Sequence, residues 1–289
     1  MNFLFVSTLN GVIYGSFLLL TSLGLSLVFG LGRVVNFAHG ALYALGGYAL
    51  LEVVRRAGLG YWGALVVAPL LVVPLAIVIE RVAIAPIRHR PDIYSLLVTF
   101  GISFMIIGAL EGVWGTGTTL VRTPSPFGGT VWILRNQYPV YRLVAAALSL
   151  IVSAGVFAFV QLTPVGLRIR AITADADMAE ALGIDVRRML TLVFGGAAGL
   201  AAFAGALGSP IFAVHPEMGT GILLDSFLAV IMGGLGNLPG SAAGAFIVAL
   251  TKSIGGGYIA DWSVALLFVV VGVVLIVRPT GILGRGRVA

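Results

Sequence analysis

Eight apolar stretches that contain no Asp, Glu, Lys or Arg account for most of this chain. A helical bilayer crossing takes ~20 predominantly apolar residues. Charged residues make up only 10% of the 289 residues, whereas soluble domains carry about 25%, so a water-soluble enzyme is excluded. Each stretch reaches or approaches the length of one membrane span, and the stretches are 1–32, 34–51, 57–79, 93–110, 143–167, 189–216, 226–251 and 262–277.

The stretches are apolar on every side, which favours helices over the strands of a membrane barrel. A transmembrane strand alternates apolar and polar residues with a period of two, and these stretches show no such alternation. The sequence therefore predicts an all-α integral membrane protein, a polytopic helical bundle of about 8 spans. The intervening loops are too short for an extramembrane domain, so residues 1–289 are predicted to form a single transmembrane domain.

Arginines gather in three regions between the stretches, and these regions predict the side that faces the cytoplasm. Short cytoplasmic loops carry an excess of Lys and Arg. Counting spans backwards from the first region places the amino terminus and the segment 111–142 outside. The net charge of +6 is spread over loops rather than gathered in one patch, so no nucleic-acid partner is expected. The arginines assigned to the cytoplasm are Arg81, Arg88, Arg90, Arg168, Arg170, Arg187, Arg188, Arg278, Arg285 and Arg287.

The stretch 226–251 cannot cross the membrane only once, because a single crossing would place the arginine-containing carboxyl tail outside. Residues 233–240 combine flexible glycines, the amide of Asn237 and a proline without an N–H, and this combination interrupts a helix. We expect two short half-helices here, a broken or re-entrant segment of the kind that lines transport pathways. A similar interruption covers residues 29–40.

Glycine is frequent, with 40 residues in the chain. In lipid, small residues spaced by four let helix backbones approach closely. We interpret the following pairs as packing faces that specify no substrate: Gly11/Gly15, Gly195/Gly199, Ala201/Gly205 and Gly240/Gly244.

Asn36 and His39 lie in the first interruption, and Asn237 lies in the second. All three are candidates for lining or gating a translocation pathway, because polar groups inside a membrane bundle mark such pathways. The alternative is structural: these side chains could satisfy backbone groups that a break leaves free, and Asn is an ordinary turn residue.

The longest internal polar segment, 163–190, has the residue order of a short capped helix. Thr173 is a candidate N-cap, Gly183 a C-terminal stop, and Asp185 a cap for the next helix. Met178, Ala181 and Leu182 share one side at helical spacing. The pattern leaves two interpretations open: this apolar ridge docks into a groove on another protein, or the helix lies against its own bundle.

No energy source is evident within the chain. The only lysine, Lys252, lacks the glycine frame of a phosphate-binding loop, and the apolar stretches contain no Asp or Glu for proton coupling. Glu217 and Asp225 are expected to flank an external loop. Energised transport would therefore draw on a partner subunit.

Three motifs carry a resemblance to a known family. Residues 24–30 read Gly-Leu-Ser-Leu-Val-Phe-Gly and lead into Asn-Phe-Ala-His-Gly-Ala at 36–41; residues 180–184 read Glu-Ala-Leu-Gly-Ile; residues 233–237 read Gly-Gly-Leu-Gly-Asn, followed by Pro-Gly-Ser. Over nearly the whole chain, the sequence resembles the membrane permeases of ATP-binding-cassette importers for branched-chain amino acids, and within them the smaller permease type.

The resemblance implies that Glu180, Ala181, Leu182 and Gly183 belong to a coupling helix that seats in an ATP-binding-cassette subunit on the cytoplasmic side. It also implies a second permease subunit that forms a heterodimer with this chain, an external solute-binding protein, and a bacterial or archaeal plasma (inner) membrane. The implied function is translocation of branched-chain, hydrophobic amino acids by alternating access, driven by ATP hydrolysis in the partner subunits. The chain itself would be a transport subunit, not an enzyme, with no cofactor.

A channel or secondary carrier for a small solute such as urea or an amide, acting without an ATPase, is the alternative. Uptake by this chain alone, insensitive to ATP, would favour it. A membrane-embedded enzyme would need a clustered acid, base or metal site. The three histidines are scattered, so no catalytic residues and no metal ligands are expected.

Overall fold

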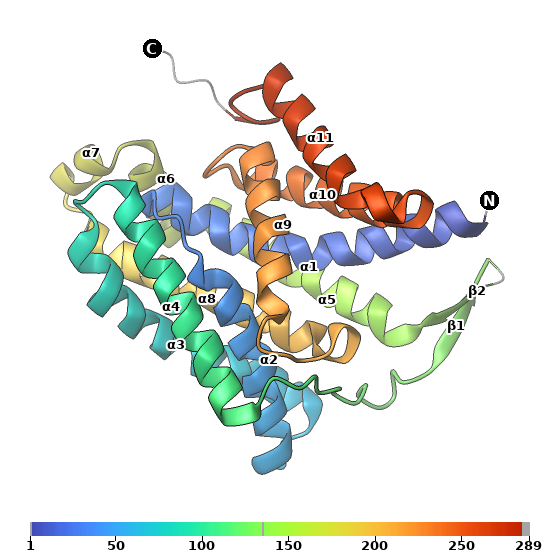
Figure 1. Cartoon of the computed structure of the whole chain (residues 1–289). Helices are drawn as coiled ribbons and strands as arrows, with labels where there is room; N and C mark the ends of the chain where they lie inside the picture. The colour runs from blue at the N-terminus through green and yellow to red at the C-terminus, as the bar shows by residue number, and fades with distance from the viewer. Residues whose placement is uncertain (1, 135, 285–289) are drawn as a thin grey trace.

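The computed structural model describes residues 2–134 and 136–284, which leaves Arg285 and Arg287 outside the described residues. Within this part of the chain nearly all regular structure is helical (Figure 1). The elements in order are α1 (Asn2–Gly32), α2 (Ala38–Arg56), α3 (Tyr61–Ile79), the π-helix η1 (Glu80–Ile84), the 3₁₀ turn η2 (Ala85–Ile87), α4 (Asp92–Trp114), β1 (Thr130–Ile133), β2 (Asn136–Pro139), α5 (Val140–Leu162), α6 (Pro164–Ala174), α7 (Ala176–Ala181), α8 (Val186–Phe212), α9 (Met218–Gly233), α10 (Leu238–Tyr258), the 3₁₀ turn η3 (Ala260–Trp262) and α11 (Ser263–Val277).

Length and composition confirm an all-α polytopic membrane bundle. Over the described residues, six helical segments are long and apolar enough to cross a membrane: α1, α3 with its extension to Ile87, α4, α5, α8 and α10. The apolar helices α9 and α11 are shorter. The exact number of crossings stays a prediction.

Helix α1 is the centre of the bundle. In its most apolar window 83% of the residues are buried, because α5, α8, α9 and α10 all pack against it. The glycines of α1 permit the closest of these contacts: a Cβ on Gly11 would lie 2.9 Å from Leu250, and one on Gly15 would lie 2.7 Å from Phe246. Both partners belong to α10, so the first and tenth helices form one tightly packed pair.

The other predicted small-residue faces also form close helix contacts. Gly195 and Gly199 of α8 face Ile77 and Val73 of α3, and Gly205 of α8 faces the backbone of Tyr43 in α2. Gly240 and Gly244 of α10 face Gly233 and Ala229 of α9. The interpretation of these pairs as packing faces is confirmed.

Helices α3, α4 and α5 form the rim. In their most apolar windows only 28%, 17% and 28% of the residues are buried. An apolar surface of this extent is compatible with lipid, where exposed hydrocarbon carries no hydration cost.

The predicted break in 226–251 is present, but its second arm is longer than expected. Helix α9 ends at Gly233 and α10 begins at Leu238. The first arm has 16 residues, about 24 Å at 1.5 Å per residue, which is shorter than a bilayer core of ~30 Å. The second arm has 21 residues and is itself a candidate span, because the helix restarts at once on a cap from Asn237 and remains apolar. In Figure 1, α9 crosses in front of α1.

A test of the α2–α8 contact follows from Gly205. In the variant Gly205→Ala the new Cβ would lie 1.9 Å from the carbonyl oxygen of Tyr43, and overpacking of this kind costs ~1–3 kcal/mol. The matched control is Gly196→Ala on the same helix, where a Cβ meets nothing within 4 Å. At that position alanine should stabilise the helix relative to glycine by up to about 1 kcal/mol. Thermal unfolding in detergent should show a lowered Tm for Gly205→Ala only. Equal Tm values would contradict this packing.

Candidate functional site

The first break, residues 33–37 between α1 and α2, has its backbone held by α4. The hydroxyl of Thr99 donates to the carbonyl of Val35 at 2.9 Å, and its oxygen accepts from the N–H of Phe37 at 3.1 Å. The side chains of Asn36 and His39 are almost fully buried, yet Oδ1 of Asn36 and Nδ1 of His39 have no hydrogen-bond partner among the described residues. Backbone capping is therefore performed mainly by Thr99, and each of these two side chains keeps one polar atom available for something else.

His39 continues into a row of buried polar groups that joins three helices. Its Nε2 lies 3.1 Å from the carbonyl oxygen of Thr21 in α1. The hydroxyl of Thr21 shares a hydrogen bond of 2.7 Å with the hydroxyl of Ser226 in α9. Three helices thus meet through polar atoms inside an apolar bundle, at the level of the first break.

Asp225, the residue before Ser226 in α9, adds a further set of polar contacts. Asp225 is almost fully buried and forms an ion pair of 2.6 Å with Lys252 of α10. The hydroxyl of Tyr14 in α1 donates to the same carboxylate oxygen, Oδ2, and Nζ of Lys252 lies 5.5 Å from the centre of the Tyr14 ring. We call the six residues of this row the polar seam: Lys252, Asp225, Tyr14, Ser226, Thr21 and His39.

The expectation that Asp225 flanks an external loop is wrong. It lies within α9, whereas Glu217 alone occupies the position before that helix. The cause is that the helix starts at Met218 and not after Asp225, so a carboxylate that separates two apolar stretches in the sequence lies inside the bundle in the structure.

Asn237 has a structural role in this conformation. Its Oδ1 accepts from the N–H of Gly240 at 2.9 Å, which makes it the N-cap of α10, and its Nδ2 donates to the carbonyl of Leu283. Among the described residues, no hydrogen bond connects Asn237 to Asn36 or His39. The second break nevertheless contacts the last turn of α1, just before the first break, because a Cβ on Gly236 would lie 2.9 Å from the Cα of Gly30.

The polar segment 163–190 contains α6, α7 and the start of α8, and one of its predicted caps is wrong. Thr173 does not cap the short helix; its hydroxyl donates to Ile169 inside α6. Asp175 is the N-cap of α7, with its carboxylate accepting from the N–H of Met178 at 2.9 Å. Asp185 caps α8 as predicted, accepting from the N–H of Arg188 at 2.9 Å.

The end of α7 is a Schellman motif, the paired closure that typically terminates a helix at glycine. The N–H of Gly183 donates to Glu180 at 2.9 Å and that of Ile184 donates to Ala179 at 3.0 Å. Gly183 has φ +85°, a left-handed conformation that glycine adopts without strain. The predicted stop at Gly183 is confirmed.

The predicted ridge on this helix is exposed. Met178 is 58% and Leu182 75% exposed, and Glu180, Ala181 and Gly183 are exposed as well. Helix α7 rests on its own bundle through Ala179, which is buried, and Ala176, which is half-buried against the same core cluster. The helix thus lies against the bundle with its ridge exposed, and docking of the ridge to another protein stays a prediction.

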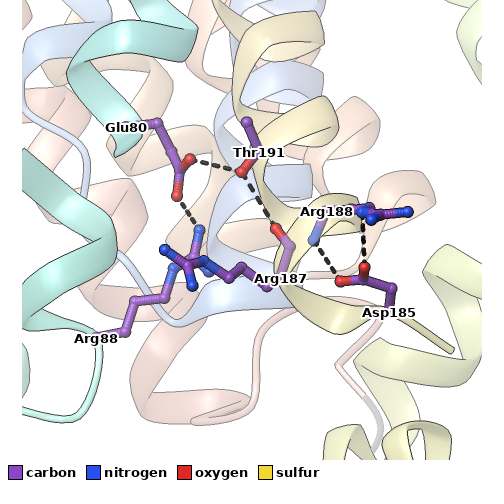
Figure 2. A network of polar contacts seen from close by, with 6 residues as sticks. All are labelled: Glu80, Arg88, Asp185, Arg187, Arg188 and Thr191. Carbon is purple, nitrogen blue, oxygen red and sulfur yellow. Dashed lines mark hydrogen bonds and ion pairs between the residues drawn. The ribbon is translucent and has the colours of Figure 1, made fainter. Parts of the chain in front are cut away.

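Figure 2 shows a polar network where the first turns of α8 meet the continuation of α3. Glu80, 1% exposed, pairs with Arg88, and its Oε2 accepts from the hydroxyl of Thr191 at 2.6 Å. Burial, and secondly the charge of Arg187, lower the pKa of the Arg88 guanidinium from its usual value, which starts far above neutrality. The network fixes the first turns of α8 to the π-helical end of α3.

This network also borders the first break. Glu80 and Arg88 line a small pocket together with Gly32 and Val34. The sequence analysis does not single out Glu80, because it directly follows an apolar stretch and its burial depends on the helix continuing past it. The available signal is its position eight residues before Arg88.

Comparisons with known proteins give matches over nearly the whole chain. Residues 7–277 match a family described as branched-chain amino acid transport system / permease component. The chain is 28% identical to the high-affinity branched-chain amino acid transport system permease protein LivH of Escherichia coli K12, over 96% of this chain and 95% of that protein. It is 27% identical to the corresponding protein BraD of Pseudomonas aeruginosa, with the same coverages.

A third relative is the permease protein LivM of Escherichia coli K12, at 24% identity over 93% of this chain and 68% of LivM. No solved structure matches. The fold and the matches define a multi-pass membrane transport protein. The chain belongs to the family of permease components of branched-chain amino acid transport systems.

The exposure and sidedness of α7 can be tested by cysteine labelling, because the chain contains no cysteine. Leu182→Cys should react with a membrane-impermeant maleimide in inverted vesicles about tenfold faster than the buried control Ala179→Cys, since reactivity follows exposure. Sealed right-side-out cells should leave both unlabelled. Reaction of Leu182→Cys from the outer face would overturn the predicted orientation of the chain.

Proposed function

We propose that this chain is the smaller membrane-spanning subunit of an ATP-binding-cassette importer in a plasma (inner) membrane, and that it moves branched-chain amino acids inward by alternating access. The energy comes from ATP hydrolysis in partner subunits, so the chain itself is a transport subunit and not an enzyme. The observation that carries this proposal is the exposed apolar ridge of α7, which capped helix ends connect to a long membrane helix and which is therefore suited to docking.

The ridge suits an ATP-binding subunit in both shape and position. Met178 and Leu182 offer apolar side chains to a groove, Glu180 lies beside them, and Gly183 leaves open space where a Cβ would meet nothing within 4 Å. Anchors of this kind, inserted into a partner's pocket, supply most of the energy of an interface. Residues Glu180, Ala181, Leu182 and Gly183 are the proposed contact set.

A displacement of the ridge reaches the membrane helices through fixed bonds. The Schellman closure and the cap of Asp185 join α7 to α8 without a flexible linker. Thr191 and Glu80 then join α8 to α3, and the pocket below Glu80 includes the first break. Movement imposed at α7 would therefore arrive at the segment that holds Asn36 and His39.

The partners follow from the same family. The alignment covers 95% of LivH but 68% of LivM, which supports assignment to the smaller permease type and pairing with a larger, different permease. The proposed complex further contains two ATP-binding-cassette subunits on the cytoplasmic side and an external solute-binding protein. The proposed pathway residues are Asn36 and His39, whereas Asn237 contributes by capping α10 at the adjacent break.

Docking can be tested with Leu182→Arg in the assembled transporter. A buried arginine would face an apolar groove, so we expect affinity for the ATP-binding subunit to fall about 30-fold or more, equivalent to ~2 kcal/mol. Gly183→Arg should act similarly, because its backbone is held at φ +85°. The measurements are co-purification of the ATP-binding subunit and ATP-driven leucine uptake in proteoliposomes.

The matched control is Leu167→Arg, a substitution of an exposed leucine (59%, against 75% for Leu182) on α6 outside the ridge. It should retain co-purification. Retention of the ATP-binding subunit by Leu182→Arg would contradict the docking proposal. Leucine uptake by the chain alone, without ATP, would instead identify a channel or secondary carrier.

The pathway role of the first break predicts a separation of uptake from abundance. His39→Leu and Asn36→Leu remove side chains with an unpartnered polar atom, so leucine uptake should fall about fivefold or more, equivalent to ~1 kcal/mol, at nearly normal membrane abundance. Thr99→Val is the contrasting control: it removes both hydrogen bonds to the break and should lower abundance and Tm, because an unsatisfied buried backbone group costs ~1–3 kcal/mol. Equal losses of uptake and abundance in His39→Leu and Asn36→Leu would favour a structural role.

A further inference from the structure

The ion pair in the polar seam is not needed to hold its helices together. Asp225 joins α9 to Lys252 on α10, but α9 and α10 already touch backbone to backbone at Gly240 and Gly244. Replacing a buried ion pair by apolar residues of similar volume is often neutral or stabilising. The chain has few charged residues, and two of them form this pair. Ionisable residues inside a membrane bundle generally have a function, so the pair calls for a functional explanation.

The pair is incompletely satisfied. Lys252 and Tyr14 both donate to Oδ2 of Asp225, and no hydrogen bond reaches Oδ1 from any described residue. The ammonium of Lys252 has three N–H donors, of which one is used by Asp225, and its side chain is 40% exposed while that of Asp225 is 6% exposed. One carboxylate oxygen and an accessible ammonium thus lie side by side with bonding capacity unused.

We propose that Asp225 and Lys252 bind the charged head group of a zwitterionic α-amino acid during translocation. The ammonium of the cargo binds Oδ1 of Asp225, and its carboxylate binds Nζ of Lys252. This inference rests on the proposed function, since it names the part of the substrate that the seam recognises.

The chemistry favours a zwitterion over other small solutes. The pair is neutral as a whole, so a ligand with one charge of each sign adds one favourable contact to Oδ1 of Asp225 and one to Nζ of Lys252. A ligand with a single charge would be attracted by one partner and repelled by the other. A neutral ligand such as urea would bring no charge to either group. In an α-amino acid both charges are carried on one carbon, which suits two groups in direct contact.

The position of the pair fits an early contact of the cargo. Tyr14 lies two helical turns before Thr21 on α1, towards the end of that helix predicted to face outside. The ring of Tyr14 packs edge-on against Phe212, with centroids 6.2 Å apart, so an apolar wall adjoins the charged groups. Beyond it along the seam lies His39, with its unpartnered Nδ1.

The test uses the complete transporter in proteoliposomes, with Asp225→Asn, Lys252→Met and the exchange variant Asp225→Lys/Lys252→Asp. Each single variant should lower ATP-driven leucine uptake about tenfold or more while the complex still assembles. In the exchange variant an ion pair is restored but the two charges are reversed in space, so uptake should stay low. Asp225→Glu, which keeps the charge in place, should recover most of the uptake.

Recovery of uptake in the exchange variant would show that the pair is only a tie between α9 and α10 and would overturn the proposal. Unchanged leucine uptake in Asp225→Asn would overturn it too, and this result also decides the matter if the exchange variant fails to assemble. Absence of ATP-driven leucine uptake in the wild-type complex would instead refute the proposed function itself.

Equilibrium binding gives a second measurement. A purely structural role of the ion pair would not make binding depend on the charges of the ligand. Radiolabelled leucine bound to the wild-type permease complex, without the solute-binding protein, should be displaced by leucine about tenfold better than by leucinamide or N-acetylleucine. These analogues each lack one of the two charges. Equal displacement by all three compounds would contradict recognition of a zwitterion.

Discussion

Backbone polar groups in a membrane have no water to bind, and this constraint shapes the whole molecule. A helix can be interrupted at membrane depth only where protein atoms or a wet cavity replace its lost hydrogen bonds. Both interruptions meet that condition locally: Thr99 binds the backbone on either side of Asn36, and Asn237 caps the helix that restarts after the second break. Because Gly236 contacts Gly30, in the last turn of α1 before the first break, the irregular backbone is concentrated in one region of the bundle.

Buried charged side chains, like the irregular backbone, occur at only a few positions in the described bundle. Among the residues whose burial the structure describes, two carboxylates are buried, and each pairs with a cation: Glu80 with Arg88, and Asp225 with Lys252. The two pairs differ in what they connect. The Asp225 pair joins α9 to α10, whereas Glu80 and Arg88 both lie in the continuation of α3, and it is the hydroxyl of Thr191 that connects Glu80 to α8.

The sequence predicted features that depend on local chemistry, and it failed where position depends on tertiary structure. The apolar stretches, the break near Asn237, the stop at Gly183 and the cap at Asp185 follow from the residues themselves. Thr173 and Asp175 are both good N-caps, and only the actual start of α7 decides between them. Asp225 and Glu80 each lie next to an apolar stretch, so their burial depended on where a helix begins or continues. Neither the seam nor the Glu80 network could be predicted, because their members are separated by up to 211 residues.

The contacts between helices that are distant in sequence bear on how a transporter with this fold would move. Helices α7, α8 and α3 are joined by caps, by Thr191 and by the contacts of Gly195 and Gly199, so they form one mechanical unit. Helices α1, α9 and α10 form a second unit, joined by Gly11 and Gly15, Gly244 and the Asp225 pair, and it packs against the first unit where α1 contacts α8. The first break follows α1 of the second unit and borders the Glu80 network of the first. We expect a force applied at α7 to turn one unit against the other at this break, since dihedral angles change there without loss of helical hydrogen bonds. On the proposed function, this is why Asn36 and His39 are next to the moving junction, while the groups that recognise cargo belong to the second unit.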